Sequence, residues 1–187
     1  FESVDLTKTH INVISKSGST IETSSQFMLA YSLMLAACNN DATECAKHFT
    51  ITTDPNGGHF RGICDTFGFA TLPVPDGVGG RFSVLSPVGL FTSEMTGLDT
   101  DSLLAGAAKV ADNLQNCSAE DDPALWYALV HILYLEQGLD KHVHFAYAHR
   151  LRLLADWYCQ LWAESLGKRH NLAGEEVNVG PTPLKAV

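Results

Sequence analysis

The sequence predicts an α/β fold in which a parallel sheet is flanked by helices. Short β-branched segments alternate with helical segments through the first half of the chain, which is the pattern of parallel strands joined by crossover helices. The 187 residues, 45% of them hydrophobic, suffice for a full core in about one to one and a half domains.

The first half of the chain carries the clearer alternation. Residues 20–37 are apolar nearly all round, so we expect this helix to be buried on most sides. A turn at 16–19 separates it from the strand before it, and a loop at 54–58 follows the second strand. The predicted elements are strands at 10–15, 49–53 and 69–72 and helices at 20–37, 42–48 and 59–67.

The second half begins with residues 73–87, the least regular part, with three glycines and three prolines. The tail from Asn171 is also expected to be irregular. The predicted elements are helices at 88–96, 101–116, 123–137 and 149–166 and a strand at 143–147. We therefore expect an α/β part at 1–86, a helical connector at 87–137 and the start of a second α/β part at 138–187.

Charge and hydropathy exclude some classes of partner. The chain has 12 basic and 21 acidic residues, a net charge of −9, which argues against nucleic-acid binding because that function needs a basic surface. The longest apolar stretch, 27–38, is too short to span a bilayer. No membrane or nucleic-acid partner is expected, while an anionic small ligand stays possible because helix ends and local charge override the net sign.

The cysteines and histidines favour neither disulfides nor a metal. The five cysteines include no CxxC pair, which is typical of reduced thiols in a cytoplasmic protein. The first residues lack the basic and apolar regions of a signal peptide. The eight histidines are scattered, and His142 and His144 would project to one side of a strand without a carboxylate at a familiar metal spacing. We expect no metal site.

A first candidate site is the segment at 15–23, with the sequence SKSGSTIET. Hydroxyl side chains surround one glycine between a strand and a helix N-terminus, where unpaired N–H groups and the helix dipole favour an anion. The same residues also fit a capping box, with Ser19 as the cap and Glu22 reaching back to it. Phosphate binding and helix capping are both compatible with this segment.

A second candidate is the loop at 75–83, with the sequence PDGVGGRFS. Its glycines allow the backbone to approach a ligand closely, and Arg81 would supply a fixed, forked positive charge. The alternative is an ordinary surface loop with a solvated arginine.

A third candidate is the helix that carries Gln160 and Glu164. The two side chains are four residues apart and therefore share a helix face. An apolar stripe that includes Trp157 lies beside them, and a carboxylate next to aromatic bulk can become a useful base. The alternative is a solvated glutamate at the end of an amphipathic helix.

Together the three segments resemble the glucose-6-phosphate isomerase (phosphoglucose isomerase) family, the bacterial branch most closely. The segment at 15–23 resembles its phosphate-binding signature, VGGRFSVLS at 78–86 its Gly-Gly-Arg loop, and QLWAESLGK at 160–168 its catalytic-glutamate helix. The similarity covers nearly the whole chain. It implies a three-layer αβα sandwich of the sugar-isomerase type, with 1–86 as the second half of a first domain and 138–187 as the start of a second.

The resemblance also implies a role for each residue. The substrate phosphate would be held by Ser15, Ser17, Thr20 and Thr23, with Lys16 beside the same pocket. Gly80 and Arg81 would contact the reacting end of the sugar, with Arg81 stabilising an enediolate. Gln160 would position the substrate, and Glu164 would move the proton between C2 and C1. No cofactor is needed, because one base and one cation suffice for this isomerisation.

The family enzyme is much longer than 187 residues and acts as a homodimer. The resemblance therefore implies that this chain is its central portion, incomplete at both ends, and that it stops before the histidine that opens the sugar ring. The implied function is the interconversion of glucose 6-phosphate and fructose 6-phosphate in glycolysis and gluconeogenesis. The alternative is a non-catalytic sugar-phosphate-binding module, which needs only the hydroxyl-rich segment.

Overall fold

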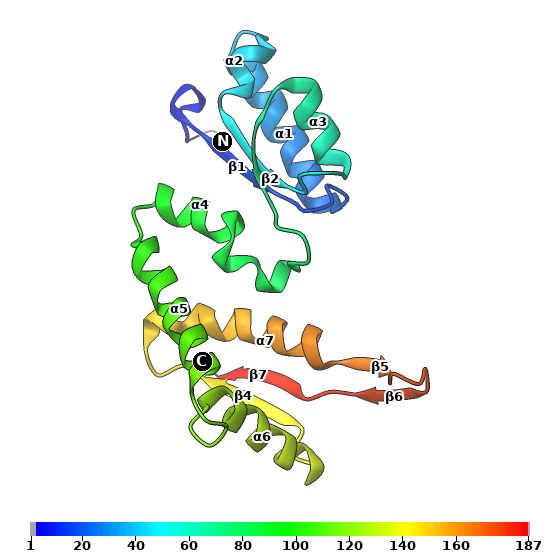
Figure 1. The fold of residues 1–187 in the computed structure, drawn as a ribbon. Helices are drawn as coiled ribbons and strands as arrows, with labels where there is room; N and C mark the ends of the chain where they lie inside the picture. Colours follow the sequence, from blue (N-terminus) through cyan, green and yellow to red (C-terminus); the bar gives the residue numbers. More distant parts are fainter. Residues whose placement is uncertain (1–2, 187) are drawn as a thin grey trace. The chain divides into compact units, whose positions relative to one another are not determined.

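The computed structural model describes residues 3–186. The chain divides into two compact units, Phe1–Asp101 and Ser102–Val187, and each is considered by itself. In Figure 1 the first unit is coloured from blue to green and the second from green to red.

The first unit is an α/β structure built on a parallel sheet. Its strands are β1 (Ile11–Ile14), β2 (Phe49–Thr53) and β3 (Ala70–Pro73), hydrogen-bonded in that order and all parallel. Helices α1 (Ile21–Ala37), α2 (Ala42–Ala46) and α3 (His59–Phe67) provide the crossovers. The remaining elements are the 3₁₀ turns η1 (Leu6–Lys8) and η2 (Gly80–Leu85) and helix α4 (Pro87–Met95).

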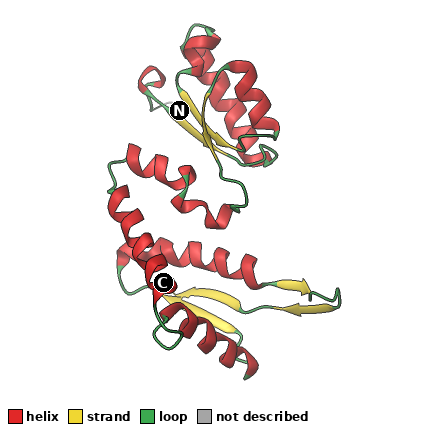
Figure 2. Ribbon diagram, in the orientation of Figure 1, coloured by secondary structure: helices red, strands yellow, loops and turns green. Residues whose placement is uncertain are grey.

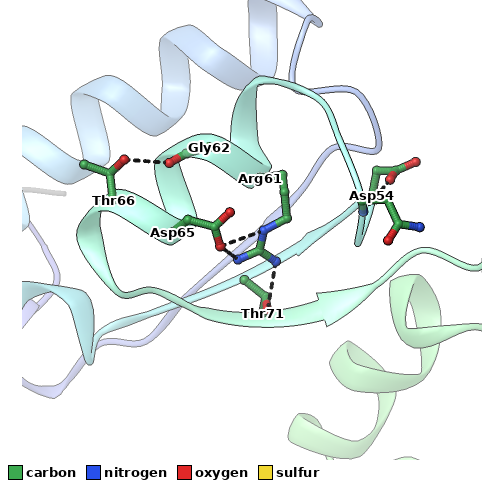
Figure 3. A network of polar contacts seen from close by, with 7 residues as sticks. Asp54, Arg61, Gly62, Asp65, Thr66 and Thr71 are labelled. Atoms are coloured by element: carbon green, nitrogen blue, oxygen red, sulfur yellow. Dashed lines mark hydrogen bonds and ion pairs between the residues drawn. The ribbon is translucent and has the colours of Figure 1, made fainter.

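The core of this unit lies between the sheet and its helices. Phe49 on β2 has no exposed surface, and its ring contacts those of Phe27 on α1 and of Phe69 just before β3, with centroids 5.8 and 5.5 Å away. Every residue of β2 is buried, as expected of a central parallel strand. On α3, Arg61 donates hydrogen bonds to Asp65 and to Thr71 on β3, so this helix is tied to the edge of the sheet (Figure 3).

The described residues of the second unit form three helices and two small sheets. The helices are α5 (Thr100–Asn116), which begins at the boundary, α6 (Pro123–Glu136) and α7 (Arg152–Leu166), preceded by the turn η3 (His149–Leu151). Strands β4 (Lys141–Phe145) and β7 (Thr182–Ala186) pair in parallel, and α7 packs against both. Strands β5 (Lys168–His170) and β6 (Glu176–Val179) form an antiparallel hairpin, drawn in yellow in Figure 2.

The predicted α/β class, with parallel strands flanked by helices, is confirmed. The prediction of an irregular tail from Asn171 is wrong, because the segments Glu176–Val179 and Thr182–Ala186 form β6 and β7. Asn171 begins the turn of the hairpin, its Oδ1 accepting from the N–H groups of Ala173 and Glu175, and the long-range pairing with β4 stabilises β7. The three-part division at 86 and 137 stays a prediction.

Helix α1 corrects a second expectation, that it is buried on most sides. Only Phe27, Ala30 and Met34 are buried, at the three- and four-residue spacing of one helical face. Met28 and Leu29 on the other side are more than half exposed. This helix thus carries more apolar side chains than the described residues of its unit bury. Within residues 3–186, no helix has the length and apolar character needed to cross a membrane.

Candidate active site

Three loops that follow the strands of the first unit line one cavity of about 720 Å³. They leave the carboxyl ends of β1, β2 and β3, which lie at one edge of the sheet because the strands are parallel, the usual place for a ligand in such folds. The lining residues are Ile14 at the end of β1, Ser15, Lys16, Ser17, Thr20 and Thr23 after β1, Asp54, Asn56, Gly57 and Gly58 after β2, and Asp76 after β3.

The first loop ends at a helix N-terminus that no side chain caps. Thr20 is the N-cap of α1 and its hydroxyl accepts no capping hydrogen bond. The predicted capping box is therefore wrong: the Ser19 hydroxyl lies 2.6 Å from the Ser17 hydroxyl instead. The sharp turn at Gly18, with φ +70°, directs Ser19 back along the loop. The first N–H groups of α1 thus lack this side-chain acceptor, which suits an anion.

Two glycines let the loops after β1 and β2 approach each other. A Cβ on Gly18 would lie 2.6 Å from the backbone nitrogen of Phe60, and a Cβ on Gly58 would lie 2.6 Å from the carbonyl oxygen of Ser17. That carbonyl accepts a hydrogen bond from the N–H of His59 at 3.0 Å. The close approach holds the hydroxyl-rich loop against the N-terminus of α3.

Two side chains of the loop after β1 take part in hydrogen bonds that shape the cavity. Ser15 is 7% exposed and its hydroxyl accepts the N–H of Gly18 at 3.1 Å, so this serine shapes the loop as well as lining the cavity. The Lys16 ammonium donates to the carbonyl oxygen of Val78 at 3.1 Å, which links the first loop to the third. Ser17, Thr20 and Thr23 complete the lining of this wall.

Two carboxylates of the cavity, Asp54 and Asp76, are not among the predicted site residues, although Asp76 belongs to the second candidate loop. Asp54 accepts the N–H groups of Asn56 and Gly57 at 2.8 and 3.1 Å, so its charge is used to shape its own loop (Figure 3). Asp76 lies in the exposed third loop. The signal for Asp54 was present, because an Asp-Pro-Asn-Gly-Gly run directly after a predicted strand is a turn at the ligand-binding edge of a parallel sheet.

Gly80 and Arg81 lie at the start of η2, two residues beyond the carbonyl that Lys16 holds. The carbonyl of Gly80 accepts the hydroxyl of buried Ser83 at 2.6 Å, which anchors the turn. The Arg81 guanidinium lies over the ring of Phe82, 4.7 Å from its centroid, and this cation–π contact orients the charge. A forked cation at this place suits a developing oxyanion.

Gln160 and Glu164 lie on one face of α7, in the second unit. The side-chain amide of Gln160 donates to Oε1 of Glu164 at 3.0 Å, and both residues are exposed. The predicted four-residue relation is therefore present as a direct hydrogen bond. This bond fixes the orientation of the Glu164 carboxylate on the helix surface.

The structure thus brings the predicted phosphate residues into one cavity and places Gln160 beside Glu164. A family model described as phosphoglucose isomerase matches residues 1–185. The chain belongs to the phosphoglucose isomerase family.

Similar proteins agree with this assignment. The chain is 43% identical over 180 residues to a glucose-6-phosphate isomerase of Carboxydothermus hydrogenoformans, covering 96% of this chain and 38% of that protein. It is 38% identical over 186 residues to a probable glucose-6-phosphate isomerase of Haloarcula marismortui, covering 100% of this chain and 39% of that protein. The chain therefore spans about two fifths of the length of these curated relatives.

Two solved structures share the fold. A hypothetical protein from Thermus thermophilus superposes with a TM-score of 0.87 at 37% identity, over 99% of this chain and 42% of that one. A glucose-6-phosphate isomerase from Chlamydia trachomatis superposes with a TM-score of 0.77 at 23% identity, over 98% of this chain and 35% of that one. This second likeness concerns the fold alone.

Phosphoglucose isomerase family membership fits the donor set of the site. The hydroxyls, backbone N–H groups and ammonium of the loop after β1 are groups that bind anions. Among the residues that the structure describes, no three His, Cys, Asp or Glu side chains gather in an arrangement that could hold a metal ion.

Proposed function

We propose that this chain is the central part of an enzyme that interconverts glucose 6-phosphate and fructose 6-phosphate. The observation that carries the proposal is the hydroxyl-rich cavity at the carboxyl edge of the sheet, in a chain of the phosphoglucose isomerase family. Glu164 is the base of the reaction and Arg81 stabilises the charge that develops. The support for these two roles is the chemistry of each group in its place.

The cavity between the first-unit loops would hold the substrate phosphate. Ser15, Ser17, Thr20 and Thr23 offer hydroxyls, the uncapped start of α1 offers N–H groups, and Lys16 offers a positive charge. A phosphate held far from the reacting carbons supplies binding energy that orients the sugar. Asp54 and Asp76, which line the same cavity, would accept hydrogen bonds from the sugar hydroxyls.

The chemistry needs one base and one cation. In the direction from aldose to ketose, a Glu164 carboxylate oxygen takes the proton from C2, and the electron pair forms the C1–C2 double bond of a cis-enediolate. The carboxyl group then returns a proton to C1, the proton of the C2 hydroxyl moves to O1, and the carbonyl forms at C2. Arg81 would face the oxygen that becomes negative, since a fixed cation there is worth most in the transition state.

Gln160 would hold the Glu164 carboxylate in the orientation that the reaction needs. Its amide donates to one carboxylate oxygen of Glu164, which fixes the orientation in which the carboxylate exchanges the proton between neighbouring carbons. No cofactor takes part in these steps, because the carboxylate carries the proton and the electron pair never leaves the substrate. We also propose that the whole protein acts as a homodimer in the cytoplasm, in glycolysis and gluconeogenesis, as membership of the family implies.

The test is an isomerase assay of the full-length polypeptide that carries this chain, with fructose 6-phosphate as substrate. Glu164→Gln should lower kcat about 10²–10⁴-fold, the usual contribution of a general base, while inorganic phosphate still inhibits competitively. The matched control is Glu120→Gln, the same change at another exposed carboxylate, which should leave kcat unchanged. Activity of Glu164→Gln at the level of this control would contradict the proposal.

The same assay distinguishes the enzyme from the alternative, a non-catalytic sugar-phosphate-binding module. Such a module would bind inorganic phosphate and fructose 6-phosphate through the first-unit cavity and show no turnover in any variant. Phosphate binding without turnover in the wild-type protein would therefore favour the module.

A further inference from the structure

A cluster of two phenols, two imidazoles and an indole joins α6, β4 and α7. Its members are Tyr127 and His131 on α6, His142 on β4, and Tyr158 and Trp162 on α7. The hydroxyls of Tyr127 and Tyr158 lie 2.8 Å apart, and each lies 3.2 Å from a ring nitrogen of His142. Nε2 of His131 lies 3.3 Å from Nε2 of His142. None of these residues has a role in the proposed reaction.

The hydrogen bonds of the cluster close into a ring with one consistent assignment of protons. Nδ1 of His131 lies 2.7 Å from the carbonyl oxygen of Tyr127 and donates to it, so its Nε2 is an acceptor. Nε2–H of His142 is shared between that acceptor and the hydroxyl oxygen of Tyr127, and Nδ1 of His142 accepts the hydroxyl of Tyr158. The hydroxyl of Tyr127 then donates to Tyr158, and every group in the ring has a partner.

The ionisation of the cluster supports this assignment near neutral pH. Burial, and then the nearby imidazoles of His131 on α6 and His144 on β4, lower the pKa of His142, so its ring is neutral and can accept. Burial and the bond to Tyr127 raise the pKa of Tyr158, so its phenol keeps the proton that it donates. The ring is thus a fixed, uncharged set of hydrogen bonds.

The ring holds the side of α7 that faces away from Glu164. Tyr158 and Trp162 are four residues apart and stack with ring centroids 5.2 Å apart, on one face of the helix. At about 100° per residue, Gln160 and Glu164 lie roughly 200° around the helix axis from Tyr158 and Trp162 respectively. A rotation of α7 about its axis would therefore move Glu164, and the hydrogen bonds of the ring resist such a rotation.

We propose that Tyr158 is a positioning residue for Glu164, acting through its hydrogen bonds to His142 and Tyr127. The inference rests on the proposed function and adds a residue to it. A helix side chain ends about 5–6 Å from the helix axis, so a rotation of about 10° displaces the Glu164 carboxylate by about 1 Å. A displacement of that size is enough to lower the rate of an oriented reaction by up to about 10²-fold.

The test compares Tyr158→Phe with wild type in the full-length enzyme, because this change removes the hydroxyl and keeps the ring that stacks on Trp162. The expected result is a fall in kcat of about 10-fold, with the KM for fructose 6-phosphate and the inhibition constant of inorganic phosphate within about 2-fold. This split distinguishes misplacement of the base from general loosening, which would also weaken phosphate binding. The matched control is Tyr147→Phe, at a residue that is 91% exposed, and it should match wild type.

A second variant distinguishes the loss of these hydrogen bonds from a general loss of folding. Tyr127→Phe removes the other hydroxyl of the ring, and the double variant should lose little more kcat than either single variant, because both changes break one set of bonds. Unchanged kcat in Tyr158→Phe, or equal losses in kcat and phosphate binding, would overturn the inference. If Glu164→Gln is fully active, the proposed function itself fails, and the two failures are thereby distinguished.

Discussion

Gly58 is the position where the structure predicts the sharpest response to a single methyl group. Its backbone lies at φ +86° and ψ 165°, a region that side-chain-bearing residues rarely enter. In Gly58→Ala the new Cβ would also lie 2.6 Å from the carbonyl oxygen of Ser17. That oxygen accepts the N–H of His59 at 3.0 Å, so the carbonyl cannot move without weakening this bond.

The expected cost of Gly58→Ala has two parts. The backbone conformation contributes about 1–3 kcal/mol, the usual cost of a residue forced into a sparsely populated region. Weakening the His59 to Ser17 hydrogen bond adds about 0.5–1.5 kcal/mol. The free energy of unfolding should therefore fall by about 2–4 kcal/mol, and because both loops line the cavity, inorganic phosphate should bind more weakly as well.

The assay is urea unfolding followed by circular dichroism, with Gly57→Ala as the matched control. Gly57 is the neighbouring residue, its φ is not positive, and a Cβ there would meet nothing within 4 Å. This control should stay within about 0.5 kcal/mol of wild type. If Gly58→Ala unfolds at the same urea concentration as Gly57→Ala, the reasoning about this loop is refuted.

Three further predictions concern charge, core packing and pH. Lys16→Met removes the ammonium that donates to the carbonyl of Val78 in the cavity, so inorganic phosphate should bind about 10-fold more weakly, a cost of about 1.4 kcal/mol. The control Lys47→Met, on the surface, should leave phosphate affinity unchanged. Equal phosphate affinities of the two variants would contradict the role of Lys16. Phe49→Ala empties the centre of the aromatic core and should lower the free energy of unfolding by about 3–5 kcal/mol in urea, and a change under about 1 kcal/mol would be inconsistent with its complete burial. Burial lowers the pKa of His142 from its ordinary 6.5, so the unfolded chain binds this proton more readily than the folded chain. The free energy of unfolding should therefore fall as the pH drops below 6.5, and it should fall less steeply in His142→Gln. Identical pH profiles of the urea midpoint in the two proteins would contradict this linkage.

Local patterns were sufficient to predict the elements of the first unit. The β-branched run at 49–53 became β2 with the predicted ends, because a fully buried strand environment agrees with local propensity. The helix at 59–67 also has the predicted ends, since Gly58 and Gly68 bound it on both sides. In these segments the local preference and the tertiary contacts favour the same structure.

The failures occurred where contacts distant in sequence or the geometry of a loop decide the structure. The pairing of β7 with β4 joins Thr182 to Lys141, about forty residues away, and no local pattern at 182–186 indicates it. Ser19 has the residue type of a helix cap, but the turn at Gly18 draws its hydroxyl to Ser17. Capping preference is a weak local signal that loop geometry overrides.

The candidate site was predicted unevenly for the same reason. The residues predicted to hold phosphate come from one short segment, 15–23, and line one cavity, and Gln160 and Glu164 were placed on one helix face by their four-residue spacing; the roles of all of them stay predictions. Asp54 and Asp76 were missed because they reach the cavity from separate loops, and only the parallel order of the strands brings those loops together.

The exchange of substrate hydrogen with solvent tests the central claim most directly. Wild-type full-length protein is incubated with fructose 6-phosphate in D₂O, and deuterium in the recovered sugar phosphates is followed by NMR, in parallel with Glu164→Gln. A carboxylate that carries the proton between C2 and C1 predicts deuterium at these carbons with wild type and incorporation about 10²-fold slower or more with the variant, while both proteins still bind inorganic phosphate. Incorporation at the same rate in both proteins would contradict the assignment of Glu164 as the base.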